Sequence, residues 1–392
     1  MSTWKVTNDM VEALSSSKLT GALPAIDGSN LTGISGFPDT TSASDPLVTT
    51  NPAGGVGTSW MNSTDGELFI CTDATTDENE WYNVGGGDGN VQTWFYWGEN
   101  NGYTMGGYAG TSGAVDIIDK YSFTSTGNAT DVGNLLAILD NGTGHHSKIH
   151  GYHIGGGVGG GQGSVMQKLT FATDADTTNV GNLTIARGQS AGNCSETHGY
   201  SASGYAGPSS SLNGSIDKFS FATDGNAVAI TGVVTVARMA PGECSTPTYG
   251  YAHGGHDVPV GFMNIIDKFS FSSEGNSTDV GDMGRGNDTA LAGCSAAAYG
   301  YIVGGHSGGT WGVGKYSFTT DGNSTDILDL TNSNYKTRYC AASTSTTHGY
   351  RSGGGQTPDT NIIDRFSFAT EATATDVGDL LTARRYICGA SY

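Results

Sequence analysis

Residues 264–280 read NIIDKFSFSSEGNSTDV, and this stretch is the clearest copy of a unit that recurs along the chain. Its core, Ile-Asp-Lys-Phe-Ser-Phe, returns with small changes at 118–123, 216–221 and 363–368, and degenerate copies occupy 165–171 and 313–318. A repeat must be recognised before any single motif is interpreted, because it decides the fold class.

The dipeptide Gly-Tyr sets the length of the repeat. It begins at residues 102, 151, 199, 250, 300 and 349, so by subtraction successive copies lie 49, 48, 51, 50 and 49 residues apart. This spacing is too long for pairs of helices and is typical of a four-stranded propeller blade of roughly 40–50 residues.

Each unit divides into four short strands. The first strand follows Ala-Arg at 186–187, 237–238 and 383–384, and the second runs from Gly-Tyr to a Gly-Gly pair. The third is the Ile-Asp-Lys-Phe-Ser-Phe core, in which Phe269 and Phe271 share one face because side chains alternate along a strand. Turns such as Asp-Gly-Asn at 224–226 supply the positive φ angles of a tight hairpin. The fourth strand, Thr-Asp-Val-Gly, lies at 278–281 and 375–378.

The Gly doublet after an aromatic strand, the aromatic third strand and the strand order resemble the kelch repeat over residues 102–392, although the Trp usual in the fourth strand is missing. The resemblance implies an all-β fold built as a kelch-like β-propeller. The first unit begins at a second strand, residue 102, and the chain ends after a first strand, 384–391. We therefore expect six blades, closed by pairing of the C-terminal strand with the first blade, without a free sheet edge.

Residues 1–35 differ from the repeat and are predicted to be an attachment and oligomerisation segment. A short helix is expected from Thr7 to Leu14, followed by two Leu-Thr-Gly copies at 19–21 and 31–33 that resemble stalk segments of bacteriophage tail fibres. An extended segment cannot bury its apolar side chains alone, so we expect oligomerisation, as a homotrimer, through Leu19, Leu23, Ile26 and Leu31. A disordered leader is the alternative.

Residues 36–90 are predicted to hold a linker and a small β module. A connector rich in Pro, Ser and Thr spans 36–50, and strands at 58–62 and 67–71 flank a hairpin turn at 63–66. Trp60, Phe69 and Trp81 are its expected core, and the wording resembles neck modules of tail fibres. Such a small module needs copies or neighbours for stability. A glycine hinge at 85–89 and an aromatic strand at 91–97 complete the prediction, the propeller domain being 91–392.

Composition excludes several classes of partner. With 17 basic and 37 acidic residues among 392, the net charge is −20, which disfavours nucleic acid and anionic membranes. No apolar run approaches ~18 residues, so we expect no membrane insertion, and residues 1–13 lack the features of a secretory leader. The 63 glycines show no Gly-X-Y period, which excludes collagen.

Most candidate chemical groups are predicted to be structural. The six cysteines lack Cys-x-x-Cys spacing and are expected to be buried free thiols, with Cys340 and Cys388 sharing a local Arg-Tyr frame. Adjacent Asp-Lys pairs, as at 119–120, point to opposite faces and belong to the frame. His145-His146 and His253 with His256 suggest a metal, but nothing completes a ligand set, so neither metal nor cofactor is expected.

Strand order places two kinds of loop at the same end of the repeat: those joining second to third strands, and those joining fourth strands to the next first strand. These loops differ between units, whereas the turns at the other end are alike, and the chain enters and leaves at that other end. Divergent loops on a repeated frame are typical of binding sites. The candidates for ligand contact are Tyr108, Tyr205, His256, Phe262, His306 and Trp311, although Phe262 and Trp311 have an alternative role in capping their blades.

The sequence favours a binding protein over an enzyme. It has no nucleophile elbow, phosphate-binding loop or zinc motif, and the loop carboxylates Asp257 and Asp359 have no evident partner. With the tail-fibre resemblance, we expect a protein of the virion tail that binds a host cell-surface glycan or protein and attaches to other tail proteins through its N-terminus. The alternative is a structural or decorating fibre on capsid, collar or tail with no receptor role.

Overall fold

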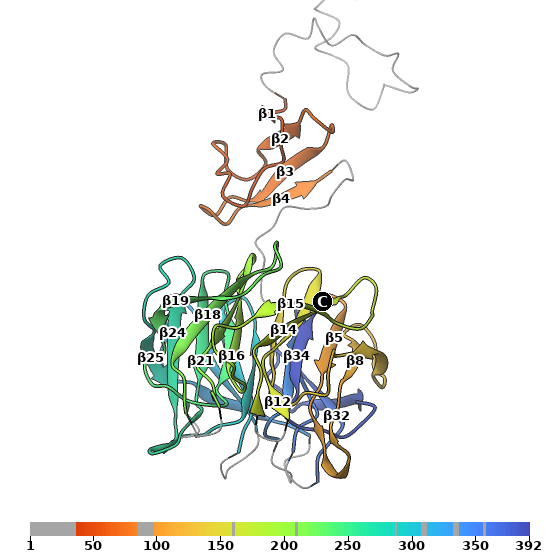
Figure 1. Ribbon diagram of the computed structural model, residues 1–392. Helices are drawn as coiled ribbons and strands as arrows, with labels where there is room; N and C mark the ends of the chain where they lie inside the picture. The colour runs from red at the N-terminus through yellow and green to blue at the C-terminus, as the bar shows by residue number, and fades with distance from the viewer. Residues whose placement is uncertain are drawn as a thin grey trace, which may run out of the picture. The chain divides into compact units, whose positions relative to one another are not determined.

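The structure, a computed structural model, describes residues 37–84 and 98–392 except 159–160, 208–210, 285, 287, 307–311, 332–336 and 356–357. The chain divides into two units between Thr93 and Trp94 (Figure 1). The described part is all-β, and none of its helices is long and apolar enough to cross a membrane. The predicted N-terminal helix, the apolar residues of the stalk, the hinge and the strand at 91–97 lie outside the described residues.

The first unit is a sheet of four strands in the order β1 (Thr40–Ser42), β2 (Ser59–Asn62), β3 (Leu68–Asp73) and β4 (Glu80–Asn83). The predicted hairpin is confirmed as β2 and β3, and Phe69 and Trp81 are buried with Trp60 packed against them. The prediction of a plain connector over 36–50 is wrong, because β1 lies in it and pairs parallel with β2. The Asp39 carboxylate fixes this pairing by accepting from the Ser59 N–H and hydroxyl.

The second unit contains six four-stranded antiparallel sheets, which we number 1 to 6 and describe from first to fourth strand. Sheets 1 to 3 are β34 (Cys388–Ser391), β5 (Asn101–Met105), β8 (Ile117–Ser122) and β9 (Thr130–Asn134); β10 (Thr143–His146), β11 (His150–Ile154), β14 (Val165–Thr170) and β15 (Thr178–Asn182); and β16 (Ala191–Cys194), β17 (His198–Ala202), β18 (Ser215–Ser220) and β19 (Val228–Val233).

Sheets 4 to 6 are β20 (Gly242–Ser245), β21 (Tyr249–His253), β24 (Ile265–Ser270) and β25 (Thr278–Asp282); β26 (Leu291–Ser295), β27 (Tyr299–Gly304), β28 (Gly312–Ser317) and β29 (Thr325–Asp329); and β30 (Ala341–Thr344), β31 (His348–Ser352), β32 (Ile362–Ser367) and β33 (Thr375–Asp379). Three small hairpins join second to third strands: β6 (Tyr108–Ala109) with β7 (Gly113–Ala114), β12 (Gly157–Val158) with β13 (Gly161–Gln162), and β22 (His256–Asp257) with β23 (Gly261–Phe262).

The repeat predicted these strands well. Each third strand lies within one residue of its expected start, and Phe269 and Phe271 do share a face, packing on Tyr200 of the preceding sheet with ring centroids 5.9 and 4.5 Å away. The C-terminal strand is shorter than the predicted 384–391, since β34 begins only at Cys388. The reason is local, because Tyr386 has φ +57° and cannot continue a strand.

The six sheets are separate and contact one another through their first strands. β34 pairs antiparallel with β5, which confirms the expected pairing of the C-terminal strand. The first strands contact one another in the order β34, β10, β16, β20, β26, β30 and back to β34. In each sheet, a single residue that lies one or two positions ahead of the first strand donates its backbone N–H to the carbonyl of its counterpart in the preceding sheet, at 2.8–3.1 Å. These residues are Asn141, Gln189, Ala240, Ala290, Tyr339 and Tyr386.

Buried ion pairs hold individual sheets together. Asp119 and Lys120 point to opposite faces as predicted: Asp119 pairs with buried Arg384 at 2.9 Å, whereas Lys120 reaches Asp174 of the next sheet. Equivalent fully buried pairs are Arg187–Asp217, Arg238–Asp267 and Arg351–Asp364. In sheet 2 both charges are absent, because Leu139 and Gln167 occupy the two positions. There the Gln167 Oε1 accepts the Leu136 N–H, as Asp267 accepts that of Thr235.

The neutral pair of sheet 2 predicts the outcome of a double-mutant cycle in sheet 4. Arg238→Leu or Asp267→Gln alone leaves a buried charge without its partner, so each should lower the free energy of unfolding by about 3–5 kcal/mol. The double variant copies sheet 2 and should be more stable than either single variant. Denaturant unfolding of the three proteins measures this, and additive losses would contradict the account.

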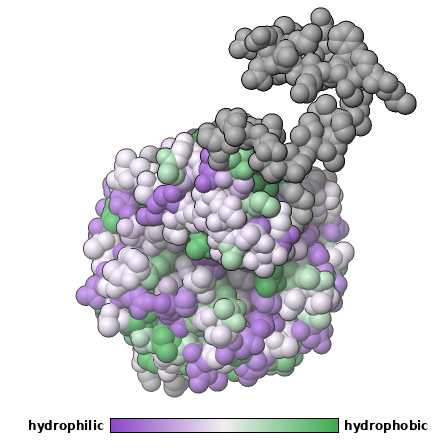
Figure 2. Space-filling model, turned by 90° about the horizontal axis from the view of Figure 1, so that it is seen from above, coloured by the Kyte–Doolittle hydropathy of each residue, from purple (hydrophilic) through white to green (hydrophobic). Residues whose placement is uncertain are grey.

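The described surface is mixed in character. On the face in view in Figure 2, hydrophilic and neutral residues predominate, and hydrophobic residues form small separate areas. All six cysteines are buried and free, which confirms the sequence prediction.

Candidate functional site

The two ends of the second unit differ in what they carry. The chain enters beside its own C-terminus, where Asn100 and Asn101 donate backbone N–H groups to the Tyr392 carbonyl at 2.6 and 2.7 Å. In Figure 1 the C-terminus lies at the upper end of this unit, and β12, in a loop between second and third strands, lies at the lower end. Within this unit the predicted polarity is therefore confirmed: entry and exit lie together, away from the divergent loops.

We call the opposite end the divergent face; it is made of the loops between second and third strands and those between each fourth strand and the next first strand. Short backbone bridges join the two kinds of loop. They link Tyr108 to Arg385, Asp140 to Gly157, Gly188 to Tyr205, Met239 to His256 and Met263 to Asp288. These bridges tether the loops that they join to one another through the backbone.

Three of the predicted ligand residues meet on this face. His256 and Phe262 face each other across the β22–β23 hairpin, with ring centroids 5.2 Å apart, and His306 contacts the other side of Phe262 at 5.0 Å. The backbone N–H of His306 donates to the Asp288 carboxylate at 2.7 Å, which anchors the cluster to sheets 4 and 5. All three side chains are half-buried, so each keeps part of its surface accessible.

The other predicted residues do not join this cluster. Tyr108 lies under the Arg385 guanidinium, 5.0 Å from its ring centroid. Tyr205 is held by backbone bridges to Gly188 and Leu212. Trp311 lies outside the described residues. The five described candidates thus divide between separate parts of the divergent face.

Sequence reasoning missed a cluster of aromatic and charged groups beside Tyr108. Tyr339 and Tyr386 pack with ring centroids 4.1 Å apart, and the Arg385 guanidinium binds the Asp359 carboxylate at 2.5 Å. Arg338 lies over the Tyr339 ring, and burial raises the pKa of Tyr339 to about 12. The sequence signal for this cluster is the Arg-Tyr dipeptide repeated at 338–339 and 385–386, which was interpreted only as the shared setting of Cys340 and Cys388.

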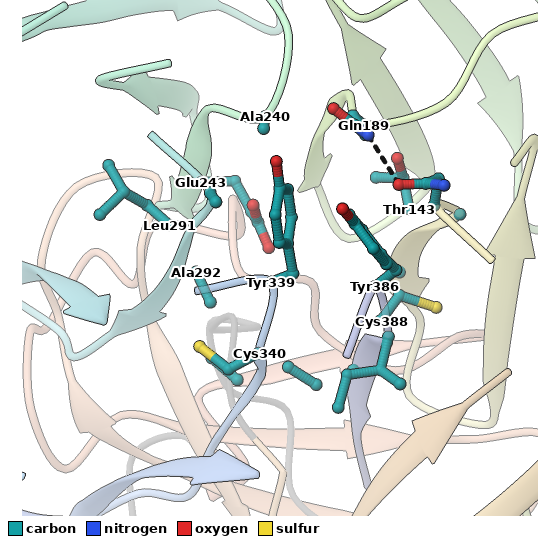
Figure 3. A pocket seen from close by; sticks show the side chains of 18 of the residues that line it. Thr143, Gln189, Ala240, Glu243, Leu291, Ala292, Tyr339, Cys340, Tyr386 and Cys388 are labelled. Carbon is teal, nitrogen blue, oxygen red and sulfur yellow. Dashed lines mark hydrogen bonds between the residues drawn. The ribbon is translucent and has the colours of Figure 1, made fainter. Parts of the chain in front are cut away.

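The two tyrosines line a pocket where the first strands of all six sheets begin. Its volume is about 60 Å³, and Asn141, Gln189, Ala240 and Ala290 complete its rim. Figure 3 shows Tyr339 and Tyr386 extending across the pocket and the Gln189 amide donating to Asn141, a bond of 2.6 Å. We call this the axial pocket.

One carboxylate, that of Glu243, points into the axial pocket (Figure 3). The equivalent residues of the other first strands are Gly144, Gly192, Gly293, Ala342 and Gly389. Glu243 is half-buried, burial raises the pKa of its carboxyl group to about 8, and its side chain makes no hydrogen bond to the described part of the chain. This departure from the repeat was readable in the sequence, but only after the first strands had been aligned.

The histidines weighed as metal ligands are core residues or part of the aromatic cluster. His145 and His146 are adjacent on β10 and buried, and the His145 Nε2 lies 2.9 Å from the Tyr200 carbonyl. Burial lowers the pKa of His145 to about 4 and that of His146 to about 3. Among the described residues, the only three side chains close enough to share an ion are Asp45, Asp65 and Glu67 of the first unit, and no histidine belongs to them.

The repeat supplies a neutral substitute for His145. Asn193 holds the same position in sheet 3 and donates to the Cys244 and Tyr251 carbonyls at 2.7 and 3.0 Å. His145→Asn should therefore fold while removing a group that titrates.

Because the pKa of His145 is lowered from 6.5 to about 4 on folding, its stabilisation is complete above pH 6.5 and is lost as the pH falls toward 4. The loss of unfolding free energy over that range should be smaller in His145→Asn than in the unaltered protein, by at most about 3 kcal/mol. Denaturant melts at pH 7, 5.5 and 4.5 measure the difference. If both proteins lose the same unfolding free energy between pH 7 and pH 4.5, the titration of His145 does not contribute to the pH dependence of stability.

Comparison of the chain with protein-family models gives no match, and comparison with curated protein sequences gives none either. The divergent face and the resemblances seen in the sequence are therefore the observations from which a function can be inferred.

Proposed function

We propose that this protein is a receptor-binding protein of a bacteriophage tail fibre, with a divergent face that binds a host surface glycan or protein. The observation that carries the proposal is the contrast between the two ends of the second unit. One end receives the chain and carries repeated turns, whereas the other carries the non-repeated loops, several of which are joined by backbone bridges. A fibre tip needs this polarity, with its attachment away from the contacting surface.

The frame proposed for this face is a six-bladed, kelch-like β-propeller. Six four-stranded sheets, first strands in cyclic contact and a closed circuit of backbone hydrogen bonds support that architecture. A closed frame suits a receptor-binding tip because it fixes loops of different blades relative to one another without a free sheet edge.

Binding accounts for the divergent face better than catalysis does. Asp359, one of the two loop carboxylates considered for catalysis, is held by the Arg385 guanidinium and by the Gly110 N–H at 3.0 Å. Hydrolysis of a glycan requires a pair of carboxyl groups poised on either side of the scissile bond. The half-buried His256, Phe262 and His306 instead keep aromatic and imidazole rings partly exposed, which suits contact with a sugar or a side chain.

The proposal is tested by host adsorption. A double variant, Phe262→Ala with His306→Ala, removes two side chains of the cluster and should reduce adsorption of phage carrying it at least tenfold. The matched control is Glu196→Ala, at the opposite end, where Glu196 makes only an exposed ion pair with Lys148 at 3.4 Å. Unchanged adsorption, together with images of virions showing the second unit packed against the particle, would favour the alternative of a decorating fibre.

We further propose that residues 1–90 form a homotrimer and attach to other tail proteins. The outer face of the first-unit sheet supports this, because Met61, Tyr82 and Val84 are 37%, 52% and 50% exposed. A small sheet with one covered and one open apolar face gains stability when a copy covers the open face.

Light scattering of the full chain should give the mass of a trimer, whereas residues 94–392 should be monomeric. Tyr82→Lys in the full chain should dissociate the trimer, since it places a charge in the proposed interface. Val228→Lys, an exposed position of the second unit, is the matched control. A monomeric full chain would refute the oligomer proposal and leave the receptor proposal standing.

A further inference from the structure

The axial pocket holds a carboxylate that the frame does not require. Gly144, Gly192, Gly293, Ala342 and Gly389 show that this position of the first strand takes a residue with little or no side chain. Glu243 places a half-buried carboxyl group there without a hydrogen-bond partner among the described residues, and burial raises its pKa. Packing does not explain why this residue departs from its five counterparts.

The groups around Glu243 are chiefly acceptors of hydrogen bonds and faces of aromatic rings. Tyr339 and Tyr386 form one wall with centroids 4.1 Å apart. On the rim, the Gln189 Oε1 is buried and has no partner in the described part of the chain, because its Nε2 is committed to Asn141. Two guanidinium groups lie near the rings: Arg385 is neutralised by Asp359, and Arg338 lies over the Tyr339 ring, 5.4 Å from its centroid. The pocket is thus complementary to a small positive group that donates hydrogen bonds.

We propose that the axial pocket binds a primary ammonium group, with Glu243 as its counter-ion and the Tyr339 and Tyr386 rings beside it. An ammonium carries three donors and is stabilised both by a carboxylate and by aromatic faces. A calcium ion requires six to eight oxygen ligands, usually with several carboxylates, and the pocket supplies one. The volume of about 60 Å³ admits a group of a few heavy atoms, such as the tip of a lysine side chain or the amine of an amino sugar.

This inference deepens the proposed function by naming a chemical group for the divergent face, and it rests on that proposal only for the source of the ligand. The binding itself is tested on the purified full chain, titrated with methylammonium chloride at constant ionic strength and pH 9, where Glu243 is ionised and the amine still protonated. Chemical-shift changes of tyrosine ring protons, against sodium chloride as the reference salt, report occupancy.

Variants separate the carboxylate from the fold. Glu243→Ala copies Ala342 of sheet 6, so it should fold normally, and Glu243→Gln keeps the shape of the side chain. Both should weaken methylammonium binding at least tenfold. Asp257→Asn, which removes an acid of the same face outside the pocket, should leave it unchanged. Absence of saturable binding, equal affinity in Glu243→Ala, or saturation by calcium chloride in place of methylammonium would each overturn the proposal.

Two further ligands identify the source of the ammonium group. Binding of N-acetyl-lysine methylamide that depends on Glu243 indicates a protein receptor, and equivalent binding of glucosamine, measured at pH 7.5 because its amine is not protonated at pH 9, indicates a glycan. Methylammonium binding with neither still supports the site and limits it to a free small amine. Host adsorption of Glu243→Ala phage is measured separately, so a receptor role can fail while the ammonium site stands.

Discussion

The architecture of the second unit depends on one circuit of backbone hydrogen bonds. In each sheet, a residue one or two positions ahead of the first strand takes a φ of +50 to +60° and donates its N–H to the backbone carbonyl of its counterpart in the preceding sheet. None of these residues is glycine, so each carries a conformational cost that the circuit must offset. Because the last of them, Tyr386, accepts from the first, Asn141, the C-terminal segment is as essential as any other.

This circuit dictates what can lie next to it. It brings neighbouring first strands so close that a Cβ at Gly144, Gly192, Gly293 or Gly389 would lie 1.7–2.2 Å from the backbone carbonyl of the strand before it. Farther from the circuit the sheets diverge, and larger groups fill the space. There Phe271 stacks on Tyr200 at 4.5 Å, and Lys120 reaches Asp174 at 2.6 Å. The gradient from glycine to aromatic pairs along each sheet follows from the geometry of the circuit.

The repeat explains which features could be predicted from the sequence. Strands and their order follow from a pattern written six times, and the pairing of β34 with β5 follows from where that pattern starts and stops. β1 was missed because its partner, β2, is unique in the chain and holds it through side-chain bonds of Asp39. The tyrosine pair was missed because Tyr339 and Tyr386 lie 47 residues apart, by subtraction, and meet only once the circuit sets the spacing.

Repetition within one chain also separates what the frame demands from what it merely tolerates. Where sheet 6 has Thr337 at the position of the other arginines, Arg351 on the neighbouring strand supplies the charge, and Asp364 keeps a partner. Where sheet 2 lacks the arginine, the aspartate is replaced by Gln167 as well. In both cases a change is compensated, because an unpaired buried charge destabilises the sheet. Glu243 has no such compensation among the described residues. It remains as a half-buried carboxyl group in the axial pocket, at a position where the other five first strands carry glycine or alanine.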